Sequence, residues 1–242
     1  MILIDSEVGK WRVFVLGCRL FAECFGAIWP VLILSSGLSI VAGWSQLQAP
    51  VDTNASFASV LVLVVVSAYL NTIVTLVCFN HMMQKPVTIG AVASLALGKL
   101  PGLMAVLLIT IVVMVLGIFL FVIPGMILAV TLMPATTLFI VRPMGPIKTI
   151  RKSHKLVWGY WLRTANIYSL YTILAIALLL PLIALIFLVD IDGLTLMDQA
   201  NLLSALATPW LSAGLAALNL VLCHDLLIRQ ERQTLIQFAS AN

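Results

Sequence analysis

The feature that most constrains this 242-residue chain is its set of long segments without Asp, Glu, Lys or Arg. Four of these segments have 26 to 32 residues, and one has 42. A transmembrane helix needs about 20 predominantly apolar residues, so the longest segment has room for two helices and each of the others for one. The uncharged segments are 24–51, 53–84, 100–141, 164–189 and 199–224. We therefore expect an all-α integral membrane protein with six transmembrane helices arranged as three hairpins.

A turn is expected inside the longest segment. Pro124 and Gly125 predict it, because proline ends a helix and glycine permits a tight reversal. The span after this turn has sixteen residues and reaches about 24 Å, which is shorter than a ~30 Å hydrocarbon core. Residues 101–141 therefore form either a full hairpin or a re-entrant pair, and the sequence leaves both open. The six expected spans are 23–43, 57–79, 101–123, 126–141, 164–189 and 200–222.

The basic residues favour one orientation. With six spans, all 13 Lys and Arg fall in segments on the same side of the membrane, namely 1–22, 80–100, 142–163 and 223–242. The loops on the other side, 44–56 and 190–199, carry only aspartate as a charged residue. The positive-inside rule therefore predicts a multi-pass protein with both termini in the cytoplasm.

Each expected hairpin follows a short segment that we interpret as an amphipathic helix on the cytoplasmic membrane surface. Thr, Ile, Leu and Gly recur in the second and third of these segments at a constant offset of 61 residues, as in Thr88 and Thr149. The pattern predicts a unit of interfacial helix and hairpin that is used three times. The three expected interfacial helices are 6–20, 87–99 and 145–161.

The third interfacial helix has the strongest pattern. An apolar face is predicted at helical spacing by Ile147, Ile150, His154, Val157 and Trp161, and basic residues fill the remaining circumference. Such a helix lies flat with its cations among anionic phosphates, and each cation contributes about 1 kcal/mol. The alternative is a loop whose cations only set topology. The predicted lipid-headgroup site consists of Lys148, Arg151, Lys152, Lys155, Trp158 and Trp161.

Residues 120–163 also resemble the YciC-like family of uncharacterised bacterial inner-membrane proteins. The resemblance rests on Ile123-Pro124-Gly125-Met126, on Gly145-Pro146-Ile147 and on the segment from Ser153 to Trp161. The region is similar as well to the membrane domain attached to some glycerophosphodiester phosphodiesterases, whose soluble catalytic domain has no counterpart here. The second expected interfacial helix has fewer charges than the family pattern. The resemblance implies a six-span protein of the bacterial inner membrane and brings no activity or cofactor.

Polar side chains inside the expected spans form a second group of candidates, because burying them in lipid is costly. Hydrogen bonds between helices would satisfy them in a purely structural role. Alternatively, Asn71, Thr136 and Asn219 line a water-accessible cavity, since proline interrupts four spans and kinked helices can border a substrate path. These prolines are Pro30, Pro134, Pro181 and Pro209. Ser204, Thr208, Ser212 and Ala216 recur every four residues and predict a face for close helix contact.

The remaining chemistry points away from catalysis. His81, His154, His224 and Asp225 have no metal-ligand spacing, and the four cysteines contain no CxxC pair, so we expect no metal and free thiols. The chain carries no motif of an intramembrane protease and none for nucleotide binding. The basic residues that raise the pI are already explained by topology and lipid, so we expect no nucleic-acid partner.

These observations lead to two hypotheses on function. The first is a non-enzymatic inner-membrane protein of envelope or lipid homeostasis that binds anionic phospholipids at its cytoplasmic face and needs no cofactor. The second is a transporter, or a permease-like subunit of a complex with another membrane protein.

Overall fold

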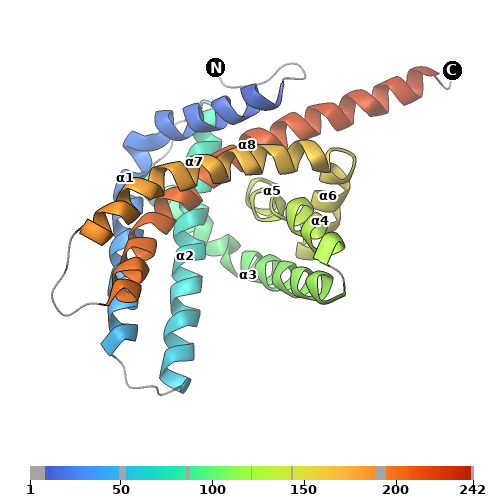
Figure 1. Ribbon diagram of the computed structural model, residues 1–242. Helices are drawn as coiled ribbons and strands as arrows, with labels where there is room; N and C mark the ends of the chain where they lie inside the picture. Colours follow the sequence, from blue (N-terminus) through green and yellow to red (C-terminus); the bar gives the residue numbers. More distant parts are fainter. Residues whose placement is uncertain are drawn as a thin grey trace.

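The computed structural model describes residues 9–48, 53–85, 88–120, 122–142, 144–188 and 195–240. Within these residues every regular element is a helix (Figure 1). The helices are α1 (Lys10–Gln48), α2 (Thr53–Met82), α3 (Ile89–Leu120), α4 (Val122–Leu132), α5 (Ala135–Val141), α6 (Pro146–Trp158), α7 (Trp161–Leu188) and α8 (Leu196–Ser240).

Six helical stretches are long and apolar enough to cross a membrane. They are Lys10–Trp44, Val60–Met82, Ile89–Phe119, Pro124–Val141, Trp161–Pro181 and Asp198–Gln233. Each contains or overlaps one of the expected spans. The prediction of an all-α membrane protein with six spans is therefore confirmed.

The antiparallel pair of α1 and α8 is the most extensive helix contact and holds much of the core. A Cβ atom added at Gly17 would lie 2.7 Å from Cδ1 and 3.0 Å from Cα of Leu218, so glycine permits the helices to approach this closely. Farther along the pair, Trp210 Nε1 donates a hydrogen bond to Ser36 Oγ (3.0 Å). Ser36 Oγ in turn donates to the carbonyl oxygen of Leu206 (3.1 Å).

Only the third expected interfacial helix is a separate element. The first, expected at 6–20, is continuous with the following span in α1, and its residues 6–8 lie outside the described residues. Nothing between it and the span ends a helix, although α1 bends so that its N-terminal part crosses the top of the molecule in Figure 1. The second, expected at 87–99, begins with a residue outside the described ones, and from Ile89 it continues through Pro101 as α3, because a helix in an apolar protein tolerates proline.

The turn before the fourth span comes earlier than Pro124. α4 begins at Val122, so Pro124 lies in the first turn, where its missing N–H has no intrahelical partner to lose. Gly125 instead permits close packing of α3 on α4: a Cβ atom there would lie 2.7 Å from the backbone nitrogen of Ile118. The span expected at 126–141 is also broken, because α4 ends at Leu132 and Pro134 precedes α5.

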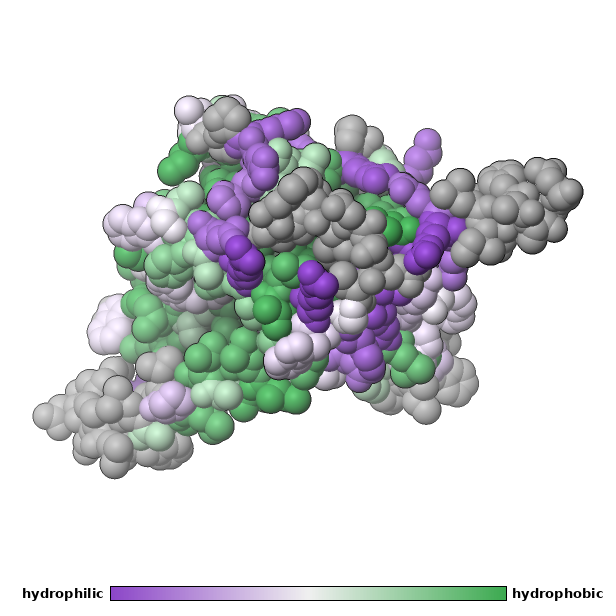
Figure 2. Space-filling model, turned by 90° about the horizontal axis from the view of Figure 1, so that it is seen from above, coloured by the Kyte–Doolittle hydropathy of each residue, from purple (hydrophilic) through white to green (hydrophobic). Residues whose placement is uncertain are grey.

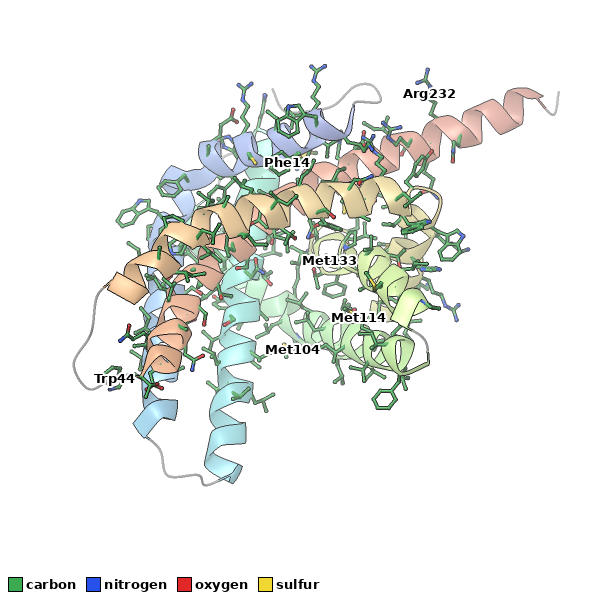
Figure 3. The ribbon with its side chains drawn as sticks, in the orientation of Figure 1. Phe14, Trp44, Met104, Met114, Met133 and Arg232 are labelled. Atoms are coloured by element: carbon green, nitrogen blue, oxygen red, sulfur yellow. The ribbon has the colours of Figure 1, made fainter. Side chains whose placement is uncertain are left out.

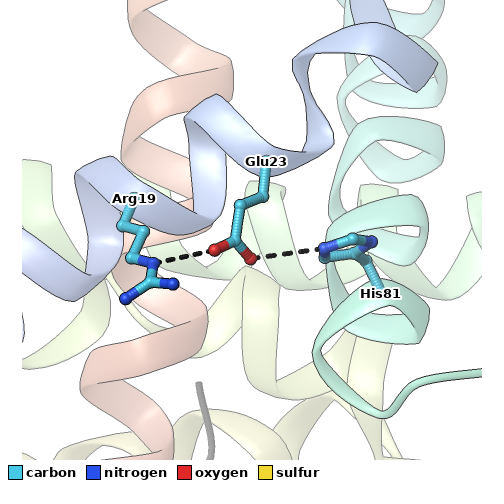
Figure 4. Close-up of polar contacts among 3 residues, drawn as sticks. All are labelled: Arg19, Glu23 and His81. Carbon is cyan, nitrogen blue, oxygen red and sulfur yellow. Dashed lines mark hydrogen bonds and ion pairs between the residues drawn. The ribbon is translucent and has the colours of Figure 1, made fainter. Parts of the chain in front are cut away.

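The helix ends that the sequence assigns to one side of the membrane lie together. Glu23 of α1 accepts a hydrogen bond from Arg19 Nε (2.8 Å) and lies 3.4 Å from His81 Nε2 of α2 (Figure 4). Asp225 of α8 pairs with Arg163 of α7. We call the region that contains these two sets of contacts the basic end; its residues are Arg19, Glu23, His81, Arg163 and Asp225. Figure 2 views the molecule from the side of both termini and shows hydrophilic residues gathered between apolar flanks.

Candidate functional site: a basic helix and a polar cavity

The basic helix α6 has clear local signals at both ends. Gly145 precedes it in an extended conformation, and Pro146 occupies the first turn, where proline is favoured. Thr149 Oγ1 donates to the carbonyl oxygen of Gly145 (3.0 Å). At the other end, Gly159 and Tyr160 form a turn before α7. The helix is therefore held as a distinct element between two tight connections.

Three sides of α6 have three different environments. One side is buried against the protein and consists of Thr149, Ser153, Leu156 and Val157. The second is apolar and exposed, with Ile147 at 62% and Trp158 at 56% relative exposure. The third carries the cations, of which Lys148, Arg151 and Lys155 are exposed and Lys152 is half-buried. This division is typical of a helix at a boundary between protein, lipid and water.

The apolar face predicted for α6 is partly wrong, because helical spacing alone does not show which residues other helices cover. Val157 is fully buried in the protein core. Trp161 begins α7 and packs half-buried against the same core. Of the two tryptophans assigned to membrane depth, only Trp158 is exposed. It lies 5.0 Å from the His154 ring, measured between ring centroids.

The buried side of α6 is attached to the end of α4. Ser153 Oγ donates to the carbonyl oxygen of Thr131 (2.8 Å). His154 Nδ1 lies 3.2 Å from Thr131 Oγ1. Both contacts fall in the last turn of α4, just before the break at Pro134. The break thus exposes backbone and hydroxyl groups that α6 engages, which fixes the rotation of α6 about its own axis.

A buried ionic cluster, missed by the sequence analysis, holds the start of α7 against α8. Asp225 Oδ2 accepts hydrogen bonds from Arg163 Nη2 (2.9 Å) and Arg229 Nε (3.0 Å), and the Asp225 side chain is 1% exposed. The Arg229 guanidinium also lies 5.8 Å from the centroid of the Tyr160 ring. The i, i+4 spacing of Asp225 and Arg229 was a usable signal, whereas Arg163 is 62 residues away.

The histidines considered for a metal site lie in separate contacts. His81 faces Glu23, and His154 faces Thr131. Asp225 is engaged with arginines instead. Among the described residues, no three His, Cys, Asp or Glu side chains are grouped to hold a metal ion. All four cysteines have free thiols, as predicted.

The three predicted cavity-lining residues are brought together by the fold. Asn71 of α2, Thr136 of α5 and Asn219 of α8 line one cavity of about 180 Å³, which we call the α2–α5–α8 cavity. A larger cavity of about 350 Å³, the α1–α2–α8 cavity, lies beside it. The two share Asn71 and Ser212 in their walls. The sequence identified these residues individually, but only the fold shows that they meet.

Two further cavities adjoin this pair. One of about 290 Å³ at the basic end shares Thr137 with the α2–α5–α8 cavity and is bordered by Arg142. Another cavity, of about 300 Å³, lies against α7 and shares Ser212 and Met133 with the α2–α5–α8 cavity. Figure 3 shows Met133 beneath α7. Cavities therefore follow one another from the α1–α2–α8 region to the basic end.

Hydrogen bonding divides the polar side chains of these cavities into two groups. Four hydroxyls donate to carbonyl oxygens of their own helix: those of Thr72, Thr75, Thr208 and Ser212. Asn219 Oδ1 accepts a hydrogen bond from Tyr168 (2.6 Å). In contrast, six side chains that line the first two cavities make no hydrogen bond within the described part of the chain: Ser35, Ser39, Ser67, Asn71, Thr136 and Thr137.

The expectation that bonds between helices satisfy the polar groups is therefore confirmed for Asn219 and wrong for Asn71 and Thr136. The small-residue face of α8 also differs from expectation. Thr208 and Ser212 border the α1–α2–α8 cavity, whereas Gly214 makes the close contact, since a Cβ atom there would lie 2.7 Å from the hydroxyl oxygen of Tyr171. Kinked helices leave space along the predicted face, so the helices meet on another side.

Comparison with protein families, curated proteins and solved structures found no match to this chain. The resemblance of residues 120–163 to the YciC-like family thus stays a prediction. By its architecture the chain is a membrane protein with six helices able to span a membrane, one separate basic helix and a mostly aliphatic cavity that contains unpaired polar side chains.

Proposed function

We propose that this protein acts without catalysis in lipid homeostasis of a bacterial envelope, by binding anionic phospholipid headgroups through α6 at the cytoplasmic face of the inner membrane. The observation that carries this proposal is the division of α6 into three sides. Its cations lie beside exposed Ile147 and Trp158, as expected of a helix that places apolar groups among acyl chains and charges among phosphates.

The charge balance of α6 supports an anionic ligand. The segment 142–163 contains six basic and no acidic residues. Within the described residues, no salt bridge engages the four cations of α6, in contrast to Arg19, Arg163 and Arg229, each of which has a carboxylate partner. An unneutralised group of cations at a membrane surface attracts anionic lipid, at about 1 kcal/mol for each charge.

The proposed location rests on the distribution of charge over the whole chain. All 13 basic residues fall in segments that six spans place on one side, and the positive-inside rule assigns that side to the cytoplasm. The inner membrane of a bacterium comes from the family resemblance alone. Anionic phospholipids are the proposed partners.

The test compares two variants that lose the same number of exposed cations. One is Lys148→Gln with Arg151→Gln and Lys155→Gln, and the matched control is Lys10→Gln with Arg12→Gln and Lys85→Gln. Native mass spectrometry of protein extracted from its membrane measures retained phosphatidylglycerol. Three charges at about 1 kcal/mol each predict roughly 100-fold weaker retention for the α6 variant. The control is expected to retain more lipid than the α6 variant, because its cations do not lie beside Ile147 and Trp158 on one helix.

Equal retention in both variants, or equal loss in both, would contradict a specific role of α6. Because the basic residues also set topology, each variant needs a check of orientation. A protease site after residue 240, cleaved only from the cytoplasmic side, provides this check. Loss of lipid in a correctly oriented α6 variant supports the proposal.

A second candidate function, a transporter or permease-like subunit, is favoured by the succession of cavities. Asn71 and Ser212 connect the α1–α2–α8 and α2–α5–α8 cavities, and Thr137 connects the latter to the basic end. The test introduces cysteine at Asn71, Thr136 or Asn219 in a cysteine-free background. Labelling of all three by a water-soluble maleimide is expected of a water-filled path, and three sealed sites would rule it out. Copurification of a stoichiometric polypeptide would identify the partner.

A further inference from the structure

Asn71 is an unusual residue for its position. It lies at the centre of the apolar stretch Val60–Met82, eleven residues from either end, so about 16 Å of helix separates it from each membrane surface. Its side chain is exposed and makes no hydrogen bond within the described residues. A carboxamide at this depth is costly unless it has a partner. Something outside the described chain must therefore supply hydrogen bonds at this point.

Other unpartnered groups face the same space. Ser35, Ser39 and Ser67 line the α1–α2–α8 cavity with Asn71, and none makes a side-chain hydrogen bond in the described chain. Ser35 is 91% buried, since its relative exposure is 9%. Three of these groups are hydroxyls, which donate and accept, and the fourth is a carboxamide, which does the same. The cavity thus presents hydrogen-bonding capacity from two helices, α1 and α2, toward its interior.

The wall restricts the chemistry of what can bind. Among the described residues, none that lines the α1–α2–α8 cavity is charged, and most of its wall is aliphatic, as at Leu32 and Val74. A charged headgroup would lose its hydration without gaining a counter-charge, so the occupant is uncharged. Thr208 and Ser212 already donate to their own helix, so toward the cavity they only accept. The occupant therefore carries at least one hydroxyl or other donor.

The route of entry points to the membrane. Val64, Asn71 and Thr208 in the cavity wall are exposed, so the cavity is open at the depth of the hydrocarbon core. At about 350 Å³ it falls in the usual range of small-molecule sites. It has room for a polar glycerol portion, while acyl chains extend through the opening into the bilayer.

We propose that the α1–α2–α8 cavity binds an uncharged lipid of the diacylglycerol class, whose hydroxyl and ester oxygens hydrogen-bond to Ser35, Ser67 and Asn71. The site requires no binding of headgroups by α6. It uses the same space as the transport alternative but does not require transport. An experiment that contradicts binding of neutral lipid in the cavity therefore leaves the proposal of anionic-lipid binding by α6 unaffected, and the reverse also holds.

The test uses the full chain in detergent with dioctanoylglycerol as the probe. Native mass spectrometry measures the fraction of protein that carries one bound probe molecule across a concentration series. Asn71→Leu is expected to weaken binding at least tenfold. Asn166→Leu is the matched control, because Asn166 is an exposed carboxamide on α7 that lines neither cavity. The control and the α6 variant are expected to bind as the unmodified protein does.

A second variant guards against an indirect effect of a large side-chain change. Ser35→Ala with Ser67→Ala removes two hydroxyls with little loss of volume and is expected to weaken binding severalfold. Dioctanoyl phosphatidic acid has the same chains with a charged headgroup and is expected to bind at least tenfold more weakly than dioctanoylglycerol.

Three outcomes would overturn the proposal. The first is unchanged dioctanoylglycerol binding by both cavity variants, and the second is equal binding of the two probes. The third is labelling of Asn71→Cys by a water-soluble maleimide that dioctanoylglycerol does not slow, which would indicate a water-filled space. Protection of Asn71→Cys by dioctanoylglycerol, but not by phosphatidic acid, supports it.

Discussion

The basic end and the middle of the membrane segment both place polar side chains among apolar neighbours, but they differ in how these groups are satisfied. At the basic end, the Asp225 carboxylate lies between Arg163 and Arg229. In the middle, Asn71 has no partner in the described chain, and neither has Ser35 across the cavity. Both arginines bind the same oxygen, Oδ2, while Oδ1 has no hydrogen bond within the described residues, and the bond from Arg163 joins α7 to α8. Cavity groups that have no partner in the chain are available to a ligand. The Asp225 cluster therefore has a structural role, whereas the unpaired groups in the middle of the membrane segment are available for binding.

The largest expected effect is the loss of the carboxylate at the basic end. Asp225→Asn removes the buried carboxylate that pairs with the mostly buried guanidinium groups of Arg163 and Arg229, which costs about 3–5 kcal/mol of unfolding free energy. Unfolding in mixed micelles with increasing dodecyl sulfate measures this value. Asp198→Asn is the control, because Asp198 accepts only exposed bonds from Thr195 and its loss costs about 1 kcal/mol. Similar values for both variants would show that the cluster does not hold α7 and α8 together.

An intermediate effect is expected at Asn219, which lines a cavity with Asn71 but, unlike Asn71, is hydrogen-bonded. Asn219→Leu leaves the buried Tyr168 hydroxyl without its acceptor, at a cost of about 1–3 kcal/mol. Tyr168→Phe with Asn219→Leu removes both partners and should recover part of this loss. Unfolding free energies of the single and double variants give the coupling. A coupling of zero would mean that the bond contributes nothing.

The smallest expected effect has the opposite sign. Asn71→Leu removes an unpartnered carboxamide from the middle of the span, so lipid-free protein should become more stable by about 1 kcal/mol. The same unfolding measurement tests this, with Asn166→Leu as the control. A loss of stability equal to that of Asn219→Leu would remove the distinction between paired and unpaired groups. It would mean that Asn71 has a structural partner.

The amphipathic pattern of α6 predicted its structure only in part. Helical periodicity correctly predicted that α6 is amphipathic, but it placed Val157 on the outward face. The pattern records which residues are apolar and not what covers them, and the structure covers Val157 with protein. In the same way, the candidate cavity residues Asn71, Thr136 and Asn219 all lie in the wall of one cavity. Their hydrogen-bonding states followed from neighbours far away in the sequence.

Proline and glycine were the most misleading local signals, because their role depends on the helices that pack around them. Pro101 does not end α3, and the N–H that Pro124 lacks is not needed in the first turn of α4. Gly125 was interpreted as part of a turn, yet it serves the contact with Ile118. A proline or glycine in a membrane helix has several possible roles, and packing selects among them.

The sequence by itself determined that this chain has six segments able to cross a membrane, and it predicts that the basic residues lie on one side. Both properties depend on local composition: an uncharged apolar segment of about 20 residues leaves water wherever it occurs, and the positions of lysine and arginine are read segment by segment. Only the tertiary structure decided that Arg163 meets Asp225 and that Asn71 meets Thr136 across a cavity. Such contacts depend on how kinked helices pack, and packing is a property of all the helices together.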